Sequence, residues 1–336
     1  MQDAIRKLLR REHLTVDESR AAMTLIMDGQ ASPVLMSAYL TALAMKGPTS
    51  DEITGAAMVM REKATRVDAG GRVVVDTCGT GGDLSGTFNI STAGALVTAG
   101  AGVAVAKHGN RGATSKSGSS DALEALGVRL DVAPEVVSRC IREVGIGFLF
   151  APMLHSSMKH AVPVRKELGF RTIFNVLGPL TNPAGARRQV MGVYEASLVP
   201  LIGEVLRNLG SEHALVVHGT DGLDEITLGG ATRAAEVTPE GVKLVELAPE
   251  QFGLARCEAS KLRVETAAES AQVIRGILDG RKGPARDIVL LNAAAAIYVG
   301  GAAKTIADGL TKAAQSVDSG AAAKVLAKLV EATRAM

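Results

Sequence analysis

Residues 73–83 read Val73-Val-Val-Asp-Thr-Cys-Gly-Thr-Gly-Gly-Asp83, and this stretch decides the fold class. Three β-branched residues predict a short strand, the glycines after them predict a tight turn, and a helix is expected to begin near Ser91. Val103–Val105, the run that ends at Phe150, and His213–Val217 have the same apolar character, and a helical pattern follows each. Strands that alternate with helices are typical of parallel βαβ units, so we expect the loops after the strands to carry function.

The sequence before this stretch contains helical patterns only. One helix is expected to begin at the capping-box pair Thr15 and Glu18 and to end before Asp28-Gly29. Two more are expected over residues 32–45 and from residue 50 to about 63. These patterns predict that the chain opens with a small helical unit.

The fold class that follows is α/β with two domains. We expect a small helical domain over residues 1–66, joined by helices from about 161–185, and a large α/β domain over residues 67–336. Ala-rich helical patterns return from about residue 267. The large domain should therefore have a mainly parallel central sheet covered by helices.

Composition excludes several classes of protein. Apolar residues make up 47% of the chain, and 37 basic against 35 acidic residues give a net charge of +2. No basic tract stands out, so neither a nucleic-acid groove nor an anionic membrane surface is expected, and the apolar stretches are short of a membrane span. The widely spaced Cys78, Cys140 and Cys257 predict reduced thiols in a cytoplasmic protein, and the charged N-terminus predicts a helix rather than a signal peptide.

The glycine-rich turn after the first strand is a candidate anion site. Glycines let backbone N–H groups approach an anion closely, and the start of a helix adds its dipole. The spacing fits neither the dinucleotide fingerprint nor the NTP-binding loop. A plain strand–helix turn is the alternative, but a carboxylate at Asp83 suits ribose hydroxyls or a metal better than it suits packing.

A second candidate loop, Lys107–Ser115, continues to Ser117–Ser119 and again follows a strand. Its cations, hydroxyls and glycines are what a polyphosphate requires, namely charge neutralisation and many short-range donors. The alternative is a solvated flexible loop. Some of its polar character also has a structural use, because the sequence from Asp121 to Glu124 should cap a helix that stops at Gly127.

Two further segments follow this pattern. The loop His218–Glu225 ends in the adjacent carboxylates Asp224 and Glu225, which repel each other unless a cation lies between them, and Mg²⁺ prefers such oxygen ligands. A solvent-facing acidic loop is the alternative. The segment Arg165–Asn175 combines Arg and Phe and could line a pocket for a flat, anionic organic molecule, or could equally be a hinge between domains.

In this order and spacing, these segments resemble the anthranilate phosphoribosyltransferase family of tryptophan biosynthesis. The resemblance covers nearly the whole chain and rests on five motifs: Gly79-Thr-Gly-Gly-Asp83, Asn89-Ile-Ser-Thr92, Lys107-His-Gly-Asn-Arg111, Arg171-Thr-Ile-Phe-Asn175 and Asp221-Gly-Leu-Asp-Glu225. It implies transfer of the 5-phosphoribosyl group of phosphoribosyl pyrophosphate (PRPP) to the amine of anthranilate. The products would be N-(5-phosphoribosyl)anthranilate and pyrophosphate, in the second step of the pathway from chorismate.

The resemblance also implies roles for particular residues. It implies that PRPP binds Gly79, Gly82, Asp83, Thr87, Asn89, Ile90, Ser91, Thr92, Lys107, His108, Gly109, Asn110, Arg111, Gly112, Ala113, Thr114, Ser115 and Ser119. Anthranilate would face Gly79, Asn110 and Arg165, and two Mg²⁺ ions per subunit would be held by Ser91, Asp224 and Glu225. The chemistry would rest on Lys107, Asp224 and Glu225.

The fold that the resemblance implies is nucleoside phosphorylase-like, with hinged domains and homodimers formed through the helical domain. Leu35, Met36, Leu40 and Leu43 are expected to leave an apolar surface there for a second copy. Two alternatives remain open, a pyrimidine nucleoside phosphorylase and a non-catalytic relative that binds nucleic acid. The acidic pair favours PRPP over free phosphate, and the absence of a basic tract disfavours nucleic acid.

Overall fold

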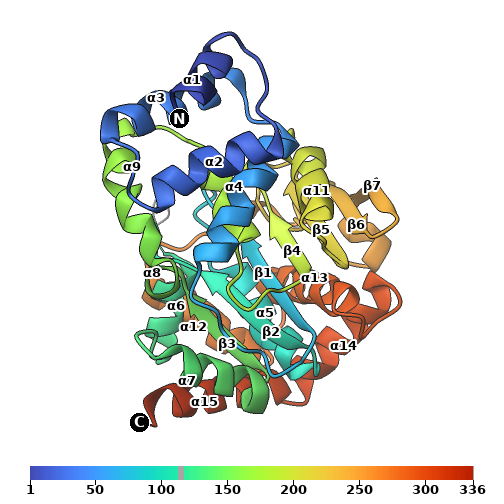
Figure 1. Cartoon of the computed structure of the whole chain (residues 1–336). Coiled ribbons are helices and arrows are strands. Elements are labelled where there is room, and N and C mark those ends of the chain that lie inside the picture. The colour runs from blue at the N-terminus through green and yellow to red at the C-terminus, as the bar shows by residue number, and fades with distance from the viewer. Residues whose placement is uncertain (113–116, 336) are drawn as a thin grey trace.

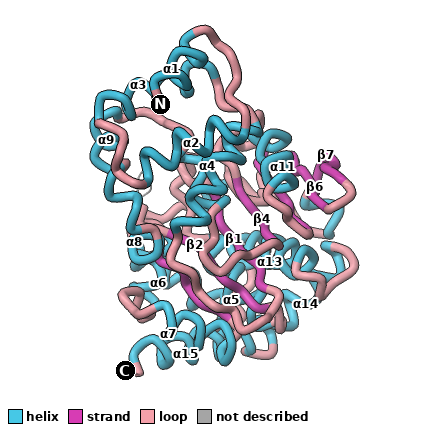
Figure 2. Tube along the Cα trace, in the orientation of Figure 1, coloured by secondary structure: helices cyan, strands magenta, loops and turns pink. Residues whose placement is uncertain are grey.

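The computed structural model of the chain describes residues 1–112 and 117–335. Figure 1 shows the N-terminal helices gathered at one end of the molecule and the C-terminal helices at the opposite side, with a sheet between them. Figure 2 shows the same layering, with the strands in the interior and helices around them. Among the described residues, no helix has the length and apolar character needed to cross a membrane.

Four helices open the chain as the sequence predicts: α1 Gln2–Leu9, α2 Val16–Met27, α3 Pro33–Lys46 and α4 Ser50–Lys63. The capping box at Thr15 is confirmed, because its side chain accepts the Glu18 N–H while the Glu18 side chain accepts the Thr15 N–H. Thr49 caps α4 in the same way. Each box satisfies donors that a helix start otherwise leaves unpaired.

The sheet has the strand order β3-β2-β1-β4-β5-β6-β7. Its bounds are β1 Val74–Gly79, β2 Ala104–Gly109, β3 Ile146–Phe150, β4 Arg188–Gly192, β5 His213–Gly219, β6 Thr232–Thr238 and β7 Gly241–Leu247. The first five strands are parallel, so the predicted mainly parallel sheet is confirmed. The antiparallel pair β6 and β7 at one edge was not expected from the sequence.

Helices cover both faces of this sheet. Those after β1 are α5 Ile90–Gly100, α6 Ser119–Leu126, α7 Pro134–Arg139, α8 Ala151–Leu154, α9 Val162–Leu168, α10 Phe174–Leu177, α11 Leu198–Asn208, α12 Ala267–Leu278, α13 Pro284–Val299, α14 Ile306–Asp318 and α15 Ala321–Arg334. A π-helical turn spans Cys140–Val144, and 3₁₀ turns span Ser156–His160, Gly178–Leu180, Pro249–Phe252 and Ala259–Leu262.

Alternate residues of the strands belong to different apolar cores. Val190 packs with the core that contains α5 and α13, whereas its neighbour Met191 packs with the core that contains α2, α4 and α11. This alternation follows from the two-residue period of a strand. One continuous core therefore joins the N-terminal helices, α11 and one face of the sheet.

The expected exposed surface on α3 is wrong in its residues. Met36, Leu40 and Leu43 are at most 2% exposed, because α3 turns these side chains into its own bundle, and Leu35 is half-buried. The exposed large apolar side chains of the bundle are instead Leu9, Val34 and Met45, at 71%, 77% and 78%. The apolar surface lies on α1 and α3, but on other faces than predicted.

Candidate active site

The loops that the sequence singles out meet at one edge of the sheet. β1, β2 and β5 are parallel to one another within the sheet and end at Gly79, Gly109 and Gly219. Because parallel strands place their carboxyl ends at the same edge, the loops after them come together there. The acidic loop after β5 lies against the glycine turn after β1, where the Gly81 N–H donates to Asp224 Oδ2 at 3.0 Å.

A glycine is required where these two loops meet. A Cβ atom on Gly79 would lie 2.7 Å from Asp224 Oδ2, which is closer than real Cβ contacts. The acidic loop also touches the neighbouring strand, since a Cβ on Gly192 would lie 1.6 Å from the Asp224 carbonyl oxygen. Side-chain atoms are therefore excluded from both strand ends, because the Asp224 carboxylate fills the space beside Gly79 and the Asp224 backbone fills the space beside Gly192.

Ser91 connects the two kinds of charge in the site. Its backbone N–H donates to Glu225 Oε1 at 3.1 Å, and its hydroxyl accepts from the Lys107 ammonium at 3.3 Å. Lys107 also donates to the Thr77 carbonyl oxygen and is 2% exposed. One residue at the start of α5 thus brings a buried cation and a half-buried carboxylate together, and all three were predicted site residues.

The acidic pair is suited to a divalent cation. Burial raises the pKa of Asp224 well above its usual value, the nearby Asp83 and Glu225 carboxylates raise it further, and burial raises the pKa of Glu225 to about 7. No group of three or more His, Cys, Asp or Glu side chains among the described residues could hold a metal alone. Proteins commonly bind Mg²⁺ through one or two carboxylates, and oxygens of the substrate and water complete its coordination shell.

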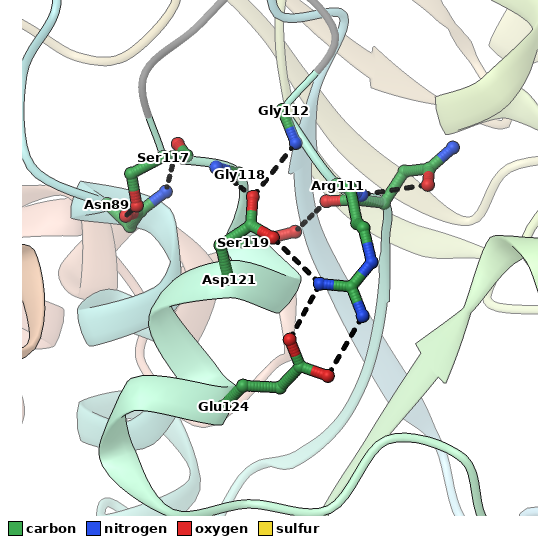
Figure 3. A network of polar contacts seen from close by, with 9 residues as sticks. Asn89, Arg111, Gly112, Ser117, Gly118, Ser119, Asp121 and Glu124 are labelled. Carbon is green, nitrogen blue, oxygen red and sulfur yellow. Dashed lines mark hydrogen bonds and ion pairs between the residues drawn. The ribbon is translucent and has the colours of Figure 1, made fainter. Parts of the chain in front are cut away.

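The candidate polyphosphate loop after β2 is held at its base by contacts with α6. The Asp121 carboxylate accepts the N–H groups of Gly112 at 3.1 Å and Gly118 at 2.8 Å (Figure 3). The Arg111 guanidinium contacts Asp121 at 3.0 Å and forms two bonds to Glu124, at 2.6 and 3.0 Å. The Arg111 side chain is therefore paired with α6. The predicted residues Ala113, Thr114 and Ser115 lie outside the described residues.

The other residues assigned to PRPP differ in how their side chains are used. The Asn89 amide is engaged by Ser117 and by Ser270 of α12 (Figure 3 shows the Ser117 contacts). Ile90 and Thr92 are buried, each with 1% of its surface exposed, so only their backbone can reach a ligand. Among the remaining side chains, Thr87 contacts Ser85 and Ser119 contacts the Asn110 carbonyl oxygen, whereas Asp83 accepts the Ser85 N–H and also lies near Asp224.

The residue predicted to bind a carboxylate is a half-buried cation without a carboxylate partner in the described structure. Arg165, on α9, has its guanidinium 5.1 Å from the centre of the Phe174 ring. Burial lowers its pKa. A desolvated guanidinium over an aromatic face suits a flat anion. Asn110 and Gly79, the other residues assigned to anthranilate, lie at the ends of β2 and β1.

Two buried histidines contact each other, His108 near the end of β2 and His155 directly after α8. The Nδ1 atom of His108 donates to the Gly178 carbonyl oxygen at 3.1 Å, which leaves Nε2 to accept from His155 Nε2 at 3.2 Å. Burial lowers the pKa of His108 to about 3 and that of His155 to about 4. Both rings are therefore neutral at pH 7, and the side chain of His108 is committed to this contact.

This pair predicts a pH dependence of stability. Because both pKa values are lower in the folded protein than in the unfolded chain, the contribution to stability is complete above about pH 6.5 and is lost as the pH falls toward 4. We expect the melting temperature to drop in that window, and the drop to be shallower in His155→Gln. Thermal melts from pH 7 to 4.5 measure this. Equal slopes for both proteins would contradict it.

Arg171, whose role the sequence did not show, contacts the backbone of the glycine turn after β1. Arg171 donates to the Gly82 carbonyl oxygen at 2.6 Å, and its guanidinium lies 3.9 Å from the centre of the Tyr194 ring. The Arg171–Asn175 motif was recognised in the sequence, but its partner lies 89 residues away and no local pattern reveals it.

Comparison with known families agrees with this geometry. A family described as "Glycosyl transferase family, helical bundle domain" matches residues 2–64, and one described as "Glycosyl transferase family, a/b domain" matches residues 71–323. The fold and the site thus define a glycosyl transferase made of a small helical and a large α/β domain.

Individual relatives narrow the class. The chain is 57% identical to the anthranilate phosphoribosyltransferase of Thioalkalivibrio sulfidiphilus, over 99% of this chain and 98% of that one. The Thermus thermophilus enzyme structure is similar with a TM-score of 0.94 and 44% identity, covering 99% of this chain and 100% of that one. The Saccharomyces cerevisiae enzyme, solved in complex with PRPP and Mg, is similar with a TM-score of 0.91 and 29% identity, covering 100% of this chain and 98% of that one. The chain belongs to the anthranilate phosphoribosyltransferase family.

Proposed function

We propose that this chain transfers the 5-phosphoribosyl group of PRPP to the amine of anthranilate and releases pyrophosphate, with magnesium required. The observation that supports this most directly is the convergence of Lys107 and Glu225 on Ser91. A pyrophosphate leaving group with its metal needs a cation and hard oxygen ligands side by side. The yeast relative, solved with PRPP and Mg, supports the same substrate and metal.

The chemistry asks for charge stabilisation and alignment. The aromatic amine is uncharged at neutral pH, so its nitrogen can form the bond to ribose C1 as the C1–oxygen bond to pyrophosphate breaks, with inversion at C1. The nitrogen then loses a proton to solvent. Lys107 places positive charge at the diphosphate. The magnesium that Asp224, Glu225 and Ser91 would hold, which we propose to be two ions, offsets further charge there.

An activity assay tests the function directly. Anthranilate fluorescence should disappear when the protein is mixed with PRPP and Mg²⁺, and should persist when any one of the three is omitted or EDTA is added. Loss of a pyrimidine nucleoside with inorganic phosphate, and no change in anthranilate fluorescence, would instead indicate a nucleoside phosphorylase.

Arg165 is proposed to bind the anthranilate carboxylate. A charge-assisted bond is worth about 1.5–3 kcal/mol, so Arg165→Ala should raise the anthranilate KM about tenfold or more and change the PRPP KM little. Lys166→Ala, an exposed cation on the same helix, is the matched control and should leave both constants unchanged. Kinetics with each substrate varied in turn decide this. Weaker PRPP with unchanged anthranilate would require another site for the carboxylate.

We also propose a cytoplasmic homodimer formed through the helical domain of residues 1–66, joined by helices from 161–185. The exposed Leu9, Val34 and Met45 on the N-terminal helices, together with Val162 and Phe170 in the joined segment, are apolar positions that a second copy could cover. Light scattering at micromolar concentration should give twice the chain mass, and Val34→Glu with Met45→Glu should shift it to the monomer mass. A monomer in the parent protein would refute the assembly.

A further inference from the structure

Asp76 is a buried carboxylate that the reaction as described so far does not use. It lies on β1, is 0% exposed, and both of its oxygens accept hydrogen bonds. Oδ1 accepts the His108 backbone N–H at 3.0 Å, and Oδ2 accepts the Asn182 side-chain amide at 2.8 Å and the Cys78 thiol at 3.4 Å. Burying a carboxylate is costly, and these three donors offset part of that cost while they fix where the group lies.

The partners of Asp76 lie on both sides of Lys107. His108 follows Lys107 directly, and the Asn182 amide that donates to Asp76 also donates to the carbonyl oxygen of Ala106 at 2.8 Å. The backbone is therefore held one residue before and one residue after the lysine. The His108 ring adds a third connection, to the Gly178 carbonyl oxygen, so the residue whose N–H donates to Asp76 also joins β2 to the segment before β4.

Asp76 also supplies negative charge near the buried Lys107 ammonium. The Lys107 ammonium donates to the oxygens of Thr77 and Ser91, which are all uncharged. The carboxylates whose charge acts on it are Asp76, Glu225 and Asp224, and the last two are the proposed ligands of magnesium. Asp76 is then the carboxylate that remains to offset the buried ammonium when the metal is bound.

We propose that Asp76 is a positioning residue for phosphoribosyl transfer, which fixes the backbone on both sides of Lys107 and supplies the counter-charge that lets its ammonium group stay buried beside the diphosphate. This inference rests on the proposed function, because it assigns Asp76 to the lysine that binds the PRPP phosphates. It predicts that Asp76 acts only through Lys107.

A double-mutant cycle tests this dependence. Asp76→Asn keeps the shape but removes the charge, and should raise the PRPP KM and lower kcat/KM for PRPP about 10- to 100-fold, as expected for weakened bonds to a charged group. In a Lys107→Met background, the same change should cost at most about threefold, because the group through which it acts is gone. PRPP affinity measured by calorimetry without Mg²⁺ should show the same non-additivity.

A purely structural role gives a different result. It would lower the melting temperature and the active fraction. It would also leave the PRPP KM unchanged and add in full to the loss caused by Lys107→Met. Either of these two kinetic results overturns the proposal. Ser316→Ala, which removes a buried bond from α14 to Val97, is the control for lost stability alone. Asn182→Ala replaces Asp76→Asn in the cycle if that variant does not fold. Parent activity with anthranilate, measured in the same assay, tests the function separately.

Discussion

The double variant Asp224→Asn, Glu225→Gln should remain folded and lose turnover by about three orders of magnitude or more, because charge on the departing pyrophosphate goes uncompensated. Both residues are half-buried, and desolvation raises the pKa of each above its unfolded value. Their contribution to stability is therefore lost as the pH rises through about 7 for Glu225. At pH 8 without metal, the variant should melt no lower than the parent protein.

Two measurements check this result together. Saturating PRPP and Mg²⁺ give kcat, and thermal melts with and without Mg²⁺ show whether the metal still binds, since a ligand that binds the folded state raises its melting temperature. The parent should be stabilised by Mg²⁺ and the variant should not. Turnover near that of the parent would show that Asp224 and Glu225 do not hold the catalytic metal. The control is Asp318→Asn, which breaks the ion pair between Asp318 of α14 and Arg286 of α13. It removes a carboxylate without touching the acidic pair.

Lys107→Met should have the second largest effect. Methionine keeps most of the buried volume, so the variant separates charge from packing. We expect kcat to fall about 100-fold and the PRPP KM to rise, because the negative charge that Lys107 faces grows as the pyrophosphate leaves. The anthranilate KM should change little, in contrast to Arg165→Ala.

Steady-state kinetics with PRPP and anthranilate varied separately give both constants. A fall in kcat with an unchanged PRPP KM would place Lys107 in the transition state only. If kcat and both KM values stay at the parent values, Lys107 is a structural cation and the diphosphate must lie elsewhere.

Local signals account for the parts of the fold that could be predicted. The N-terminal helices carry caps and stops within a few residues of their ends, so their bounds follow from the sequence alone. β1, β2 and β5 are apolar runs bounded by glycine. β4 begins with the polar pair Arg188 and Gln189, whose partners come from other segments, and nothing local marks it as a central strand.

The candidate site divides in the same way. The residue types for a cation, an acidic pair and a glycine turn are visible in the sequence, and the strand-end rule brings them to one edge. The sequence could not show that Arg111 turns toward Asp121 and Glu124, or that Arg171 reaches Gly82, because these partners are set by how separate elements pack. Asp76 lies in the stretch 73–83 that decides the fold class, yet its partners, apart from Cys78, are distant in the chain.

The apolar core shared by the N-terminal helices and one sheet face bears on how natural variation reaches the active site. Ile26 of α2 and Val216 of β5 belong to that core, so a substitution that loosens the bundle also loosens the strand leading to the acidic loop. Such changes would reduce the amount of working enzyme in a cell without touching a single ligand contact. Strains with partial tryptophan requirement can thus arise from lesions far from the substrates.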